Sequence, residues 1–200
     1  MLRADLGGVR VGEACPVALI GVLNVSPESF YRGSVHRDPD DLLRVAEGMV
    51  EAGAAILDIG AMSTAPYLPT QVSEEEEAER LASAVRLVAT KLAVPISADT
   101  TRSGPARAAL EAGATVVNDV SGLTTDPAMA PLVAARNAGL IVMASERSSE
   151  ATGAPVEVVR DLLDESLRIA ARAGIPAERI VVDPGIGFFR RQQIPWHEWD

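Results

Sequence analysis

Short apolar runs alternate with longer amphipathic stretches along most of the chain. The apolar runs are rich in Val and Ile and cover residues 17–24, 54–60, 94–98, 115–118, 139–144 and 179–183. Residues 39–52, 73–92, 103–112, 127–138 and 155–173 carry apolar side chains at helical spacing. Runs that are apolar throughout are typical of parallel strands covered on both faces. The alternation therefore predicts six repeated strand–helix units.

Local signals mark where the predicted helices begin and end. The stretches "EAGAAILDIG" from residue 51, "EAGATVVNDV" from 111 and "RAGIPAERIVVDPG" from 172 each place a glycine between a helix and the next strand, as left-handed helix caps require. Ser73, followed three residues later by Glu76, predicts a capping box. We interpret the acidic run 74–77 as the solvated first turn of that helix, where negative charge suits the helix dipole.

Polar residues end nearly every predicted strand: Asn24, Asp58, Asp99, Asn118 with Asp119, and Asp183. In an open doubly wound sheet the site gathers mainly at one switch point, whereas in a barrel all strand ends meet at one mouth. The absence of a GxGxxG turn after the first strand also weakens a dinucleotide-binding interpretation. We therefore predict an α/β fold of the TIM-type (β/α)8 barrel class.

The predicted strands fall short of a complete barrel. No linker or shift in composition divides the chain, so a single domain over residues 1–200 is the simplest interpretation. A complete barrel has eight strands and typically about 250 residues. We expect this domain to be incomplete at its C-terminus, most simply because the sequence is a fragment.

Composition narrows the functional classes. The 200 residues are 48% hydrophobic, with a formal net charge of -10 and a pI near 4.7. That acidity argues against nucleic acid, since a phosphate-binding face needs clustered Lys and Arg, and argues weakly against anionic membranes. No apolar run approaches the roughly 18 residues of a membrane span. The single cysteine, Cys15, excludes an internal disulfide and predicts a reducing, cytoplasmic location.

Five stretches, in order, resemble one family. They are "GVLNVSPESF", "GAAILDIGAMSTAP", "ISADT", "VVNDVSG" and "VVDPGIGF". The ordered set is similar to the signatures of the dihydropteroate synthases, within the wider superfamily of pterin-binding barrels. The resemblance implies a transferase that joins an arylamine such as p-aminobenzoate to a hydroxymethyldihydropterin pyrophosphate, releasing pyrophosphate in folate biosynthesis.

The resemblance assigns roles to particular residues. Asp99 would stabilise positive charge that develops on the pterin as pyrophosphate leaves. Amides and carboxylates complement the amide edge and 2-amino group of a pterin. The implied pterin-binding residues are Asp99, Asn118, Met143, Asp183 and Phe188.

Two loops and a metal complete the implied site. Asn24 resembles the family's Mg²⁺ ligand, and a single amide oxygen suffices because Mg²⁺ keeps waters and phosphate oxygens. The alternative role for Asn24 is to cap the strand–loop turn. Phe30, Ser63, Thr64 and Pro66 would contact the arylamine or form the surrounding loops. For Asp58 and Asp119, structural and functional roles both stay open. The resemblance also allows a homodimer.

The chain departs from the family pattern at several places. The family has an Arg at the position of Ala65, often a His at that of Ala144, and a Lys at that of Arg190. The Lys of strand seven and the Arg-x-His motif of strand eight are absent. These departures resemble an outlying, archaea-associated branch of synthase-like proteins. The missing groups keep open a non-catalytic pterin-binding protein or half of a two-chain enzyme. A methyl-folate corrinoid methyltransferase, which would share the Asp/Asn/Asp pterin set, is the other alternative.

Overall fold

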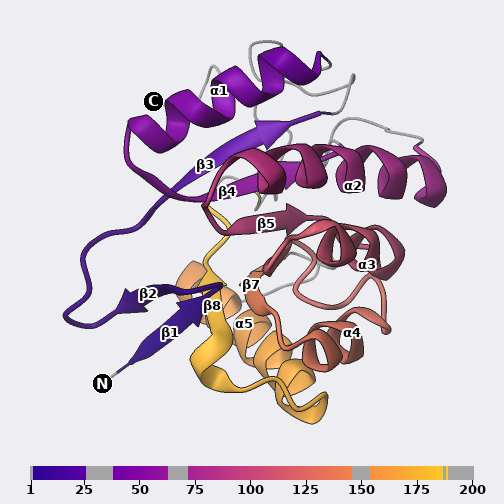
Figure 1. Ribbon diagram of the computed structural model, residues 1–200. Coiled ribbons are helices and arrows are strands. Elements are labelled where there is room, and N and C mark those ends of the chain that lie inside the picture. The colour runs from indigo at the N-terminus through magenta and orange to yellow at the C-terminus, as the bar shows by residue number, and fades with distance from the viewer. Residues whose placement is uncertain (1, 26–37, 63–71, 146–153, 187, 189–200) are drawn as a thin grey trace, which may run out of the picture.

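Six parallel strands form one curled sheet with helices on its outer side (Figure 1). The computed structural model describes residues 2–25, 38–62, 72–145, 154–186 and 188. In sheet order the strands are β3 (Leu19–Asn24), β4 (Ala54–Gly60), β5 (Ile96–Asp99), β6 (Val116–Asp119), β7 (Gly139–Met143) and β8 (Ile180–Asp183). Spatial order follows chain order, as in the wall of a barrel. The six predicted strands are confirmed, and among the described residues the first five of them are each followed by a helix.

Within the described residues, five helices and one short 3-10 helix connect the strands. They are α1 (Pro39–Glu51), α2 (Glu74–Lys91), α3 (Ser103–Ala112), α4 (Met129–Arg136), α5 (Pro155–Arg172) and η2 (Ala177–Arg179). The predicted cap of α2 is confirmed, because Ser73 Oγ accepts a hydrogen bond from the Glu76 N–H at 3.1 Å. Gly53 and Gly113, which follow α1 and α3, have φ angles of 103° and 123° that strongly favour glycine.

Two apolar clusters hold the helices to the outer face of the sheet. One packs α1, α2 and α3 against β3, β4 and β5, with Leu23, Leu57 and Leu81 fully buried. The other packs α4 and α5 against β6 and β7, around Met129 and Leu140. Alternate strand residues supply these clusters, so the residues between them face the inside of the curl.

An antiparallel hairpin that the sequence pattern did not predict closes the amino-terminal end of the sheet. Its strands are β1 (Arg3–Leu6) and β2 (Val9–Gly12), and β1 contacts β7 and β8 (Figure 1). Leu6 is 2% exposed and packs with Ile56, Val116 and Ile141 on the inner face of the sheet. The inside of the curl therefore has an apolar floor at the amino-terminal ends of its strands.

The two outermost strands each pair with a single neighbour within the described part of the chain. On β3, Ile20 and Val22 are paired with Ile56 and Asp58 of β4, which face the interior. The side chains of Ile20 and Val22 are nevertheless 40% and 52% exposed, respectively. The expectation that every strand is covered on both faces is wrong for β3, because a wall of six strands does not close into a barrel. None of the described helices is long and apolar enough to cross a membrane.

Candidate functional site

Strand register gathers the predicted polar residues at the carboxyl-terminal mouth of the sheet. Asn24 pairs with Gly60, Gly60 with Asp99, and Asp99 with Asn118, which makes one continuous row across β3, β4, β5 and β6. Register partners in neighbouring parallel strands point to the same face. The prediction that these strand ends converge is confirmed for Asn24, Asp99 and Asn118, and the row lies above the apolar floor.

Asp58 lies one step deeper than this row and holds Asn118. The Asn118 amide Nδ2 donates to Asp58 Oδ2 at 2.9 Å. Burial raises the pKa of the Asp58 carboxyl, and the polar groups of Ser97 and Asn118 oppose that rise. Because the Nδ2 of Asn118 is engaged by Asp58, its carbonyl oxygen is directed elsewhere. Asp58 therefore positions Asn118, a contact that strand alternation alone did not reveal.

Asp99 is the most electrostatically perturbed carboxyl group of the site. Its Oδ1 is inaccessible to solvent, and none of the described residues donates a hydrogen bond to that atom. Burial, reinforced by the negative charges of Asp58, Asp119 and Glu77, raises the pKa of Asp99 well above its usual value. A buried carboxylate oxygen without a donor is costly, and such groups concentrate where a ligand completes the contacts.

A space at Gly60 separates Asp99 from Asn24. A Cβ atom at Gly60 would lie 3.1 Å from Asn24 Oδ1 and 3.2 Å from Asp99 Oδ2. Both oxygen atoms therefore border the same small volume at the mouth. Gly60 was not among the residues predicted for the site, because its part depends on register between strands that are distant in sequence.

Glu77 corrects the interpretation of the acidic run as simply solvated. Its side chain is fully buried and accepts hydrogen bonds from Thr100 Oγ1 at 2.5 Å and from the Arg102 guanidinium at 3.1 Å. Arg102 also donates to the Val72 carbonyl at 3.0 Å. Burial raises the pKa of Glu77, while Thr100 and Arg102 oppose the rise. This network joins the start of α2 to the residue that follows Asp99.

Asp119 has a structural role, which settles one of the two open assignments. Its carboxylate accepts hydrogen bonds from Ser121 N at 2.8 Å, Ser121 Oγ at 2.6 Å and Leu123 N at 3.1 Å. Burial raises the pKa of Asp119, and these hydrogen bonds lower it. With both oxygens engaged by the loop after β6, Asp119 shapes that loop.

The remaining predicted residues differ in how they are placed. Met143, 3% exposed, ends β7 beside Asp183, whose Oδ1 accepts from Gly185 N at 2.8 Å. Ala144 is buried, and its N–H donates to the Asp183 carbonyl at 2.8 Å. Phe188 is 39% exposed. Their contacts with a pterin stay predictions. Phe30, Ser63, Thr64, Ala65, Pro66 and Arg190 lie outside the described residues.

The mouth offers oxygen donors that suit Mg²⁺. Asn24 Oδ1 lies beside Gly60 at this mouth, and Mg²⁺ can use a single protein oxygen together with phosphates and waters. In the described ranges, no group of three or more His, Cys, Asp or Glu side chains could hold a metal ion by itself. The donors present thus fit an ion that arrives with a phosphorylated ligand rather than one held in a protein cage.

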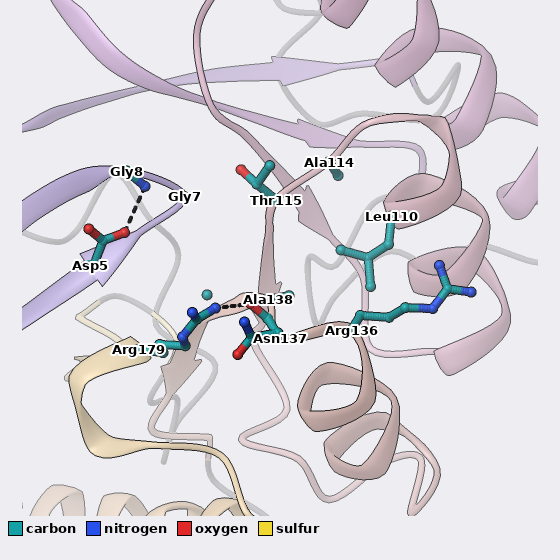
Figure 2. Close-up of a pocket in the computed structure, with 11 residues that line it drawn as sticks. Asp5, Gly7, Gly8, Leu110, Ala114, Thr115, Arg136, Asn137, Ala138 and Arg179 are labelled. Atoms are coloured by element: carbon teal, nitrogen blue, oxygen red, sulfur yellow. Dashed lines mark hydrogen bonds between the residues drawn. The ribbon is translucent and has the colours of Figure 1, made fainter.

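A cavity of about 440 Å³ lies at the opposite, amino-terminal end of the strands (Figure 2). Several of its polar groups are already engaged by the protein. Gly8 N donates to Asp5 Oδ1 at 2.7 Å, Arg179 donates to the Asn137 carbonyl, and Arg136 pairs with Glu111. Active sites of barrels lie at the carboxyl-terminal face, where this chain keeps its unpartnered carboxylate oxygens.

The fold is that of a barrel wall with polar side chains at its mouth, and comparison with known proteins identifies its family. The chain belongs to the family described as pterin binding enzyme, whose profile matches residues 20–200. It is 41% identical over 189 residues to a dihydropteroate synthase of Mycobacterium leprae, covering 90% of this chain and 66% of that protein. The chain thus spans slightly under two thirds of the length of this relative.

Solved structures of dihydropteroate synthases share the fold. The Xanthomonas albilineans enzyme with 4-aminobenzoic acid superimposes with a TM-score of 0.80 at 33% identity, over 94% of this chain and 67% of that one. The Burkholderia cenocepacia enzyme complexed with 7,8-dihydropteroate gives a TM-score of 0.78 at 35% identity, over 93% of this chain and 64% of that one. The predicted barrel class is confirmed by these neighbours.

Proposed function

We propose that the protein acts as a dihydropteroate synthase, condensing a hydroxymethyldihydropterin pyrophosphate with an arylamine such as 4-aminobenzoate. The observation that carries the proposal is the row Asn24–Gly60–Asp99–Asn118, with a buried Asp99 oxygen at the mouth that has no partner among the described residues. Relatives that bind 4-aminobenzoic acid and 7,8-dihydropteroate support the two substrate classes. The proposal concerns the whole protein, of which these residues supply six strands and the five helices between them.

In this reaction the bond between the pterin methylene carbon and the pyrophosphate oxygen breaks, and its electron pair leaves on that oxygen. The arylamine nitrogen then bonds to the methylene carbon and gives up a proton. Asp99 stabilises the positive charge on the pterin, because a fixed carboxylate in a dry site needs little reorganisation. Asn118, held by Asp58, and Asp183 read the amide edge of the pterin.

The metal and the cellular setting belong to the same proposal. Asn24 would hold Mg²⁺ through Oδ1, and the ion would contribute positive charge next to the departing pyrophosphate. Met143 and Phe188 would line the pterin site, and Phe30, Ser63, Thr64 and Pro66 the arylamine side. We also propose that the protein is cytoplasmic and able to form a homodimer. Its single cysteine, Cys15, is free, which suits a reducing compartment.

The test is release of pyrophosphate by the full-length native protein supplied with both substrates and Mg²⁺. We expect release that requires the arylamine, falls strongly in Asn24→Ala, and is lost in Asp99→Asn. Binding of pterin without turnover would instead favour the pterin-binding protein or the two-chain enzyme. Methyl transfer that needs a corrinoid protein would favour the methyltransferase.

A further inference from the structure

Gly60 is the member of the polar row that carries no side chain, and its position is unusual. It is buried at the end of β4, between Asn24 on one side and Asp99 on the other. Its φ angle lies outside the positive range, so its backbone conformation is open to any residue. The reason for glycine here is therefore space rather than backbone freedom.

The space at Gly60 is bordered by two oxygen atoms of different character. A Cβ would lie 3.1 Å from the Asn24 amide oxygen and 3.2 Å from the Asp99 carboxylate oxygen, both closer than the 3.4 Å at which ordinary contact begins. The other Asp99 oxygen is buried and accepts no hydrogen bond from the residues that the structure describes. A ligand group lying over Gly60, between these two oxygen atoms, would contact both side chains at once.

We propose that the missing side chain of Gly60 makes room for the reacting methylene–oxygen bond of the pterin pyrophosphate, so that Gly60 is a positioning residue for the reaction. This inference rests on the proposed function, which assigns Asp99 to the pterin side and Asn24 to the pyrophosphate side. The bond that breaks joins exactly those two parts of the substrate. It therefore lies between the two side chains, over the residue that separates them.

The proposal predicts a division between two ligands. Gly60→Ala places a methyl group against the position of the pterin's methylene substituent. It leaves the pterin ring contacts of Asn118 and Asp183 intact and shifts Asp99 by only a few tenths of an ångström. Binding of a pterin without a substituent at position 6 should therefore change little, whereas binding of a 6-hydroxymethylpterin should weaken clearly. Turnover should fall about 100-fold, as expected for reacting groups displaced by about 1 Å.

The experiment measures the affinity of both pterins by calorimetry and pyrophosphate release for the full-length protein and Gly60→Ala. Gly48→Ala is the matched control, because a Cβ at Gly48 meets no atom within 4 Å. We expect this control to behave as the parent protein in all three measurements. Equal binding of both pterins by Gly60→Ala, or equal weakening of both, would overturn the proposal.

Two further readings keep the test decisive. If circular dichroism shows that Gly60→Ala does not fold, the double variant Asn24→Ala/Gly60→Ala is compared with Asn24→Ala, because Asn24→Ala removes one of the two crowding oxygens. The proposal is supported if the double variant binds 6-hydroxymethylpterin more weakly but binds the unsubstituted pterin as Asn24→Ala does. Unchanged binding of 6-hydroxymethylpterin refutes it. If the parent protein releases no pyrophosphate, the proposed function fails, while the division between the two pterins still decides the role of Gly60.

Discussion

Replacing Asp99 with asparagine should stabilise the folded protein at neutral pH while removing its activity. One oxygen of the carboxylate is buried and has no donor among the described residues. Burial first, and then the charges of Asp58, Asp119 and Glu77, act against its ionisation. Asparagine keeps the shape of the side chain but carries no charge. Leaving a buried polar group unsatisfied costs about 1–3 kcal/mol, and more when it is charged. We therefore expect Asp99→Asn to raise the free energy of unfolding by about 1–3 kcal/mol at pH 8.

The direction of the pH dependence follows from the raised pKa. An unfolded aspartate ionises near pH 3.8, whereas Asp99 in the folded protein keeps its proton to higher pH. Between these two pKa values the folded state binds more protons, so the contribution of Asp99 to stability falls as pH rises. In Asp99→Asn this contribution is absent. The gain in stability over the parent should therefore be small near pH 4 and largest above the folded pKa.

The assay is urea unfolding at several pH values between 5 and 8. Asp126→Asn is an informative control, because the Asp126 carboxylate accepts from Ser103 N at 2.7 Å and Ala128 N at 2.8 Å. Burial acts to raise the pKa of Asp126, but these hydrogen bonds outweigh it and hold the pKa below its usual value. Asp126→Asn should therefore lose stability at neutral pH. A less stable Asp99→Asn at pH 8 would refute our description of Asp99.

Three further predictions concern activity and the packing around the site. The kcat/KM for pyrophosphate release should rise with pH through an apparent pKa above 3.8, because Asp99 must be ionised to stabilise the pterin cation; a profile without this limb contradicts that role. Glu77→Ala should lower the free energy of unfolding, measured by urea unfolding, by about 2–3 kcal/mol. This is less than for a fully buried ion pair, because Arg102 is partly exposed. Glu77→Gln should lower the free energy of unfolding by a smaller amount in the same assay. Leu6→Ala should cost about 2–5 kcal/mol in the same assay, and a loss below 1 kcal/mol would mean that the hairpin does not close the floor.

Hydrophobic periodicity was enough to predict the six strands and five helices, because each element has its own hydrophobic pattern over a continuous stretch of sequence. The observed β4 (Ala54–Gly60) and α3 (Ser103–Ala112) have the predicted bounds. The convergence of Asn24, Asp99 and Asn118 was also predictable, since carboxyl-terminal strand ends in a barrel share one mouth.

The hairpin, the burial of Glu77 and the position of Gly60 were not predicted, and each has a physical reason. The hairpin's strands are only four residues long, and the burial of Leu6 depends on strands far along the chain. Glu77 was hidden within four consecutive glutamates, although it precedes the buried Leu81, Val85 and Val88 on the same helical face. The spacing of 77, 81, 85 and 88 was the available signal. The role of Gly60 required cross-strand register, which the sequence pattern does not specify.

The most direct test of the account is detection of dihydropteroate by mass spectrometry after the full-length protein is incubated with the pterin pyrophosphate, 4-aminobenzoate and Mg²⁺. The same incubation is run with Asp99→Asn, which is expected to be folded and more stable than the parent, and with Asp126→Asn at a temperature where that control stays folded. The account predicts product from the parent and from Asp126→Asn, and none above background from Asp99→Asn. Product formation by Asp99→Asn at the parent's rate would contradict it.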